Sequence, residues 1–120
     1  MAEVLLVDDS AVMRELLTEA IDDPHTVIDE ASNGREAVEI VEERDGSIDV
    51  ILMDIVMPEL DGIEATRQIK SMYPSLKVVF CTSVTQQDRM KDAIEAGADG
   101  YIPKPFEEGI ISVAIEDALS

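Results

Sequence analysis

Short apolar runs alternate along the chain with segments whose apolar residues have helical spacing. Strand-length runs occupy residues 4–7, 27–31, 50–53, 78–81 and, more weakly, 100–102. Apolar residues three or four positions apart occupy residues 12–20, 37–41, 63–72, 90–94 and 110–118. Strands that alternate with helices over short connections are typical of parallel sheets covered on both faces. The pattern therefore predicts a doubly wound α/β domain with a five-stranded parallel sheet.

Turn and cap residues fall between the predicted elements. We expect Ser10 to cap the first helix, Asn33-Gly34 and Asp61-Gly62 to begin the next two, and Gly97 to end the fourth. Pro103 has no N–H to donate, which places the fifth strand at an edge of the sheet. The 120 residues contain no linker, so residues 1–120 are predicted to form one domain without an output domain.

The composition limits the class of protein. Hydrophobic residues make up 46% of the chain and aromatic residues only 3%, so the core must be largely aliphatic. The single cysteine, Cys81, can form no internal disulfide and is expected in the core, and no Cys/His cluster has zinc spacing. The apolar runs are far shorter than the ~18 residues that span a bilayer, and the chain begins without a basic signal segment. These features predict a soluble cytoplasmic protein.

The charge of the chain is strongly negative. Nine basic against 27 acidic residues give a net charge of −18, well beyond the about 2 to 8 that suffice for a small domain. Nucleic acid and anionic membranes are therefore poor partners. Because 1 M salt screens charges over about 3 Å, the composition suits a salty cytoplasm and predicts a halophilic source. The alternative is that the acidic residues only form a solvated surface.

Reactive side chains follow four of the predicted strands. Asp8 and Asp9 follow the first strand, Asp54 the third, Thr82 the fourth and Lys104 the fifth. Open parallel sheets bind ligands at the carboxyl ends of their strands. If the first and third strands are neighbours, three carboxylates converge, and their repulsion raises pKa values or requires a cation. Oxygen ligands without Cys or His favour Mg²⁺.

Each of these residues also has a simple structural explanation. Asp8 or Asp9 alone could cap a helix, Thr82 could be an ordinary hydroxyl at a strand end, and Lys104 could be a solvated surface lysine. A third carboxylate at Asp54 favours a site over a cap.

Four motifs at these strand ends resemble one known family. They are VDDS at residues 7–10, MDIVMPELDG at 53–62, CTS at 81–83 and GADGYIPKPF at 97–106. Together they resemble the receiver domains of two-component response regulators, most of all the single-domain receivers of chemotaxis. The resemblance covers the whole chain and implies the flavodoxin-like strand order 2-1-3-4-5.

The resemblance implies a phosphoacceptor site. Asp54 would attack the phosphorus of a phosphohistidine on a sensor histidine kinase and form an acyl phosphate. Asp8, Asp9, Asp54 and the backbone carbonyl of Val56 would hold Mg²⁺.

It also implies a conformational switch. Lys104 would pair with the phosphoryl oxygens, and a cis bond to Pro105 would aim its ammonium at the site. The Thr82 hydroxyl would bind another phosphoryl oxygen, and Tyr101 would turn inward when Thr82 moves. The fourth helix, fifth strand and fifth helix would then form the output surface.

The implied partners are a sensor histidine kinase of chemotaxis and a motility motor switch or its adaptor, bound by a monomeric protein. The water that hydrolyses the acyl phosphate would pass between Val56 and Val84, which are aliphatic and cannot orient it. A brief signal would therefore require a separate phosphatase.

Three other functions are alternatives to a chemotaxis receiver. A phosphorelay shuttle would use the same Asp54 chemistry with another partner. A flavodoxin-like electron carrier needs an uncharged phosphate loop after its first strand, where this chain has Asp8 and Asp9. A phosphohydrolase with an Asp nucleophile would carry Asp-x-Asp there, which Asp8-Asp9-Ser10 does not match. The sequence thus favours a signalling phosphoacceptor over an enzyme.

The salt adaptation can be tested on stability. We expect the melting temperature to rise from low to multimolar KCl, past the range where ordinary surface electrostatics is already screened, because many like charges must be screened. Thermal melts across KCl concentrations measure this. A melting temperature that does not depend on KCl would contradict the halophilic interpretation.

Overall fold

The computed structural model describes residues 2–107 and 109–120, without the side chains of residues 84, 85 and 87. Its strands are β1 (Glu3–Val7), β2 (Thr26–Ala31), β3 (Val50–Asp54), β4 (Lys77–Thr82) and β5 (Gly100–Pro103). Its helices are α1 (Ala11–Ala20), α2 (Gly34–Glu43), α3 (Gly62–Met72), α4 (Met90–Ala96) and α5 (Ile110–Leu119), and a 3₁₀ helix, η1 (Val84–Arg89), precedes α4.

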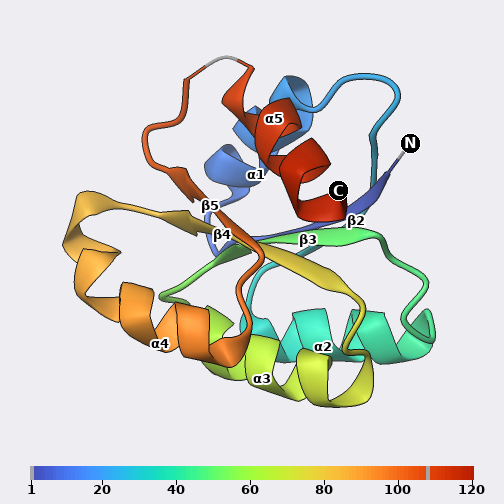
Figure 1. The fold of residues 1–120 in the computed structure, drawn as a ribbon, viewed down its shortest axis with the longest axis vertical. Coiled ribbons are helices and arrows are strands. Elements are labelled where there is room, and N and C mark those ends of the chain that lie inside the picture. The colour runs from blue at the N-terminus through green and yellow to red at the C-terminus, as the bar shows by residue number, and fades with distance from the viewer. Residues whose placement is uncertain (1, 108) are drawn as a thin grey trace.

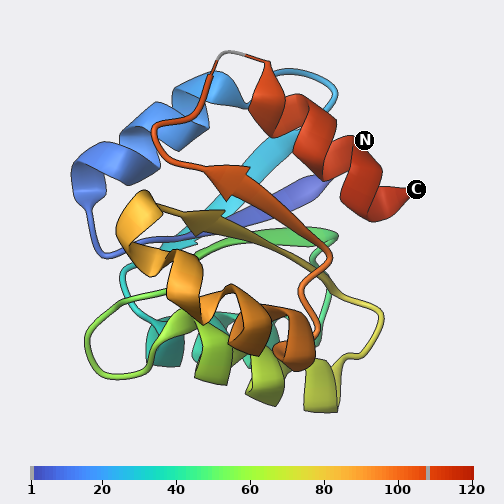
Figure 2. The ribbon, with the colours of Figure 1, turned by 60° about the vertical axis from the view of Figure 1, so that its left-hand side comes forward.

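The strands form one parallel sheet in the order β2-β1-β3-β4-β5. Helices α1 and α5 cover one face, and α2, α3 and α4 cover the other (Figures 1 and 2). The predicted fold class and the strand order implied by the resemblance are both confirmed, and β5 is an edge strand as Pro103 indicated. The 3₁₀ helix η1 was not predicted.

Side chains of the central strands alternate between two cores. In β1, Leu5 and Val7 pack with the residues under α2, α3 and α4, whereas Val4 and Leu6 pack with those under α1 and α5. Burial on both faces explains why these strands are continuous apolar runs without a polar face. Cys81 belongs to the second core, as expected of a small buried side chain.

The predicted caps hold the ends of the helices. Ser10, Asn33 and Asp61 each accept a hydrogen bond from the backbone N–H three residues later, at the start of α1, α2 and α3. Gly97 follows α4 with a left-handed φ of 108°, a conformation that glycine adopts without strain. Because all the strands are parallel, their carboxyl ends lie together at the same end of the sheet.

Gly62 brings the start of α3 directly against the end of β3. A Cβ atom on Gly62 would lie 1.9 Å from the backbone oxygen of Asp54, a distance no side chain tolerates. The Gly62 N–H also donates to the carbonyl of Ile55 at 2.7 Å. The missing side chain therefore lets the backbone of Gly62 lie directly against that of Asp54.

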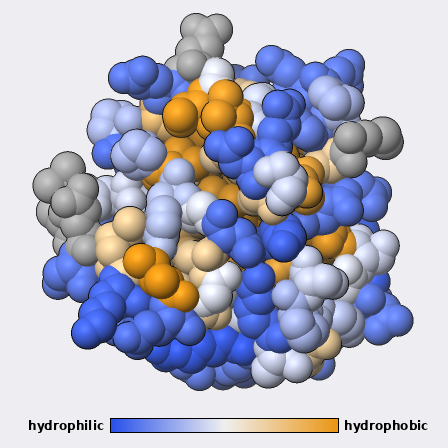
Figure 3. Space-filling model, in the orientation of Figure 1, coloured by the Kyte–Doolittle hydropathy of each residue, from blue (hydrophilic) through white to orange (hydrophobic). Residues whose placement is uncertain are grey.

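Hydrophilic residues dominate the face of the molecule in Figure 3, and apolar residues appear there in separate small patches. This distribution agrees with the net charge of −18. Within the described residues, no helix has the length and apolar character needed to cross a bilayer.

Candidate functional site

Three carboxylates meet at the carboxyl edge of the sheet. Asp8 follows β1 and Asp54 ends the neighbouring strand β3. One carboxylate oxygen from each of Asp8, Asp9 and Asp54 lies within 4.8 Å of the others. Asp8 and Asp54 are buried, whereas Asp9 is exposed. The convergence predicted from the sequence is confirmed, and we call these three residues the carboxylate cluster.

Backbone groups hold Asp8 on several sides. Its N–H donates to the carbonyl of Ala31 at the end of β2, at 3.1 Å. Its Oδ1 accepts a 2.9 Å hydrogen bond from the N–H of Ser10. Asp8 therefore accepts a backbone hydrogen bond while Ser10, not Asp8 or Asp9, caps α1. This removes the helix cap as the reason for two adjacent aspartates.

Lys104 enters the cluster from the end of β5. Its Nζ lies 3.1 Å from Oδ2 of Asp8 and 3.4 Å from Oδ1 of Asp54. Its backbone N–H donates to the carbonyl of Thr82 at 2.6 Å, and the peptide bond to Pro105 is cis, as predicted. Lys104 thus contacts the carboxylate cluster and is not a solvated surface lysine.

Burial and charge shift the pKa values of Asp54 and Lys104. Burial raises the pKa of Asp54, and the charge of Asp8 adds to this, while Lys104 and the N–H of Ile55 partly oppose it. For Lys104, burial acts to lower the pKa, but attraction from Asp54 and Asp8 outweighs it and raises the pKa overall. The ammonium therefore stays protonated and neutralises only part of the cluster.

The donor set of the cluster fits a hard divalent cation. Carboxylate oxygens within a few ångströms of one another are ligands that Mg²⁺ accepts, and its remaining positions can keep water. Val56 lies in the loop after β3, with its side chain 52% exposed at the surface. Its carbonyl remains a predicted ligand.

The water that hydrolyses the acyl phosphate was predicted to pass between Val56 and Val84. The Val84 side chain lies outside the part of the chain that the structure describes.

Thr82 and Tyr101 lie on the neighbouring strands β4 and β5. Thr82 ends β4 and is buried, and Tyr101 lies in β5, partly buried against the core under α2, α3 and α4. Burial raises the pKa of Tyr101. Their predicted roles in switching remain predictions, because they concern a movement between two states.

Sequence reasoning gave no role to Arg14, yet its guanidinium lies beside the cluster. Nη1 of Arg14 donates to the carbonyl of Asp8 at 2.7 Å. The signal was present, because Arg14 follows the capping residue Ser10 by four positions and therefore one helical turn. Sequence reasoning also gave no role to His25, which lies in a loop and is buried, with Nε2 3.4 Å from Oε2 of Glu116.

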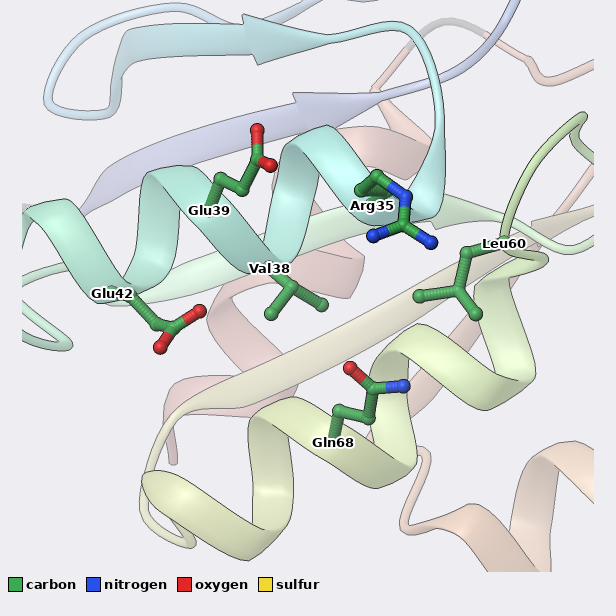
Figure 4. Close-up of a pocket in the computed structure, with 6 residues that line it drawn as sticks. All are labelled: Arg35, Val38, Glu39, Glu42, Leu60 and Gln68. Carbon is green, nitrogen blue, oxygen red and sulfur yellow. The ribbon is translucent and has the colours of Figure 1, made fainter.

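A surface hollow of about 240 Å³ lies between α2 and α3 (Figure 4). Val38 and Leu60 contribute apolar side chains, and polar side chains surround them. The residues that line the hollow are Arg35, Val38, Glu39, Glu42, Leu60 and Gln68. None of them belongs to the carboxylate cluster.

Comparisons with known proteins agree with this geometry. Residues 4–116 match the family described as the response regulator receiver domain. The chain is 50% identical over 118 residues to the chemotaxis protein CheY of Halobacterium salinarum, across 98% of this chain and 97% of that one. Identity to CheY of Bacillus subtilis is 39% over 118 residues, with the same coverage. A chain of the CheX–CheY–BeF3–Mg²⁺ complex from Borrelia burgdorferi matches with a TM-score of 0.91 and 28% identity, over 99% of this chain and 90% of that one.

The raised pKa of Asp54 predicts how pH affects the metal-free protein. The folded state binds the Asp54 proton more tightly than the unfolded state, so ionised Asp54 lowers stability at neutral pH and ceases to do so as pH falls through its folded pKa. We expect Asp54→Asn to raise the free energy of unfolding by about 1 kcal/mol at pH 7 in EDTA, with a smaller gain near pH 4.

Urea unfolding at several pH values measures this gain. The exposed Asp22→Asn is the control, because it relieves the same unit of net charge without touching the cluster. A gain for Asp54→Asn no larger than that of Asp22→Asn would contradict the prediction.

Proposed function

The chain belongs to the response regulator receiver family, and we propose that it is a chemotaxis response regulator that accepts a phosphoryl group on Asp54. Chemotaxis proteins of the same length support this, since the chain covers 97% of each of two CheY relatives. Such receivers are signalling proteins, which sets the chain apart from flavodoxin-like carriers and phosphohydrolases.

One observation carries the proposal: a buried aspartate lies beside an ammonium and two further carboxylates. Asp54 Oδ1 lies 3.4 Å from Lys104 Nζ, and Asp8 and Asp9 lie within metal-binding distance. In the transfer, a carboxylate oxygen of Asp54 forms a bond to phosphorus. The P–N bond to the kinase histidine breaks, and the imidazole leaves with its electron pair.

The residues around Asp54 stabilise the charge that the phosphoryl group brings. Receiver domains bind Mg²⁺ at this acidic pocket, and we assign Asp8, Asp9, Asp54 and the carbonyl of Val56 as its ligands. When bound, Mg²⁺ would neutralise phosphoryl oxygens and the repulsion among the carboxylates. Lys104 would turn its ammonium from the carboxylates to a phosphoryl oxygen, and the Thr82 hydroxyl would donate to another.

The change in the partners of Lys104, from carboxylates to a phosphoryl oxygen, would begin the signal. Lys104 contacts Asp8 and Asp54, so a phosphoryl group would offer it a competing anion. Movement of Thr82 toward the phosphoryl group would open space that Tyr101 fills, which changes the surface of α4, β5 and α5. The change in that surface is what a downstream partner would read.

The partners follow from the same family. Receivers of this type interact with histidine kinases and downstream targets, and we assign a chemotaxis kinase upstream and a motility switch or its adaptor downstream. A phosphatase would complete the cycle in the cytoplasm. A phosphorelay shuttle would keep the Asp54 chemistry and differ only in the protein that receives the signal.

Phosphorylation should require both Asp54 and Mg²⁺, because the metal neutralises the site and the incoming group together. Acetyl phosphate with Mg²⁺ should add one phosphoryl group to the wild type, and EDTA should reduce the rate by at least about a hundredfold, as expected when electrostatic stabilisation is lost. Intact-protein mass spectrometry over time measures this.

Asp54→Asn should remain unlabelled, while Asp22→Asn should be labelled at the wild-type rate. A label that persists in Asp54→Asn would overturn the assignment of the acceptor, and labelling indifferent to EDTA would overturn the role of the metal.

A further inference from the structure

Arg14 joins the carboxylate cluster to the end of β2. From α1, its Nη1 donates to the carbonyl of Asp8 at 2.7 Å, and its Nε donates to Oε1 of Glu30 at 2.9 Å. Only 19% of the Arg14 side chain is exposed, so both contacts hold a largely immobilised guanidinium. The planar fork of arginine suits this arrangement, because two donors point in fixed directions.

The carbonyl that Arg14 contacts belongs to the peptide bond between Asp8 and Asp9. A peptide unit is planar, so fixing its oxygen also fixes the direction in which the backbone of Asp9 leaves Asp8. The Asp8 N–H is held separately by Ala31, and its carboxylate by the N–H of Ser10. Arg14 thus supplies the remaining hold on the segment that carries two of the three carboxylates.

Glu30 keeps the guanidinium in place and compensates its charge. Without this partner, Arg14 would bring a positive charge toward a site that must attract a cation. With it, the guanidinium donates a hydrogen bond to the site while the pair adds no net charge.

We propose that Arg14, oriented by Glu30, is a positioning residue for divalent-cation binding, which it promotes by fixing the Asp8–Asp9 peptide. The proposal rests on the proposed function, since it concerns the same site. For a variant without Arg14, the proposal predicts a change in Mg²⁺ affinity opposite in sign to the change that simple electrostatics predicts. Removing a nearby positive charge should tighten Mg²⁺ binding, whereas removing a positioning contact should weaken it.

The first test is the affinity of Arg14→Met for Mg²⁺, measured by calorimetric titration with MgCl₂ at fixed ionic strength. Methionine keeps an unbranched stem and removes the donors. We expect the dissociation constant to rise about tenfold, the lower end of what loss of a residue that orients metal ligands causes. An unchanged or tighter constant would overturn the proposal.

A charge-neutral variant separates the two explanations further. Arg14→Met combined with Glu30→Gln removes one charge of each sign, so electrostatics alone predicts the wild-type affinity. We expect about tenfold weaker binding again. If Arg14→Met does not fold in EDTA by circular dichroism, Arg14→Lys replaces it. Lysine keeps the charge and loses the fork, so wild-type affinity in that variant would overturn the proposal.

Arg44, the residue that caps the carboxyl end of α2, provides a matched control. It also joins a helix to β2, with Nη2 3.2 Å from the carbonyl of Ile28 and 3.4 Å from Oδ2 of Asp29. Arg44→Met should leave the Mg²⁺ constant within twofold of wild type. An equal loss of affinity in Arg44→Met would mean that Arg14 acts only through general stability, and would overturn its specific role.

Phosphorylation by acetyl phosphate gives a second readout. Arg14→Met should be labelled slowly at low Mg²⁺ and approach the wild-type rate at saturating Mg²⁺. A defect that saturating Mg²⁺ leaves unchanged would contradict a role in cation binding. If the wild type itself binds no Mg²⁺, the proposed function fails; if the wild type binds Mg²⁺ and Arg14→Met binds it equally well, only the positioning role fails.

Discussion

The structure depends on holding like charges together in a buried place. Asp8 and Asp54 are nearly inaccessible to water, and the only ammonium within ion-pair distance of both among the described residues is that of Lys104. One positive charge cannot neutralise three carboxylates, so the pKa of Asp54 stays raised by its burial and by Asp8. Under the proposed function, this unbalanced charge would give the site its affinity for a cation and its response to a phosphoryl group.

The backbone of the fold holds these carboxylates close together despite their mutual repulsion. Parallel pairing of β1 with β3 places Asp8 beside Asp54, and aliphatic cores on both faces of the sheet keep those strands fixed. Gly62 lets α3 begin against the backbone of Asp54, and backbone N–H groups contact Asp8 and Asp54 directly. Rigid elements thus hold the carboxylates where side-chain repulsion alone would separate them.

Much of this could be predicted from the sequence, because the relevant signals are local. Apolar runs predicted the strands, Ser10 and Asp61 predicted helix starts, and polar residues at strand ends predicted the cluster. What was missed depends on contacts between distant segments. Arg14 on α1 pairs with Glu30 on β2, and His25 is buried beside Glu116, 91 residues away. The segment that forms η1 is polar and has no clear helical period, so nothing marked it in advance.

The central claim is that Lys104 and a metal compete for the same carboxylates. The decisive measurement is the Mg²⁺ dissociation constant of Lys104→Met by calorimetric titration, with the exposed Lys91→Met as a control for net charge. If the Lys104 ammonium neutralises only part of the carboxylate charge, removing Lys104 should tighten Mg²⁺ binding by at least about tenfold. The reason is that an ammonium a few ångströms away no longer repels the metal. An affinity that is unchanged, weaker, or altered equally in Lys91→Met would contradict the account.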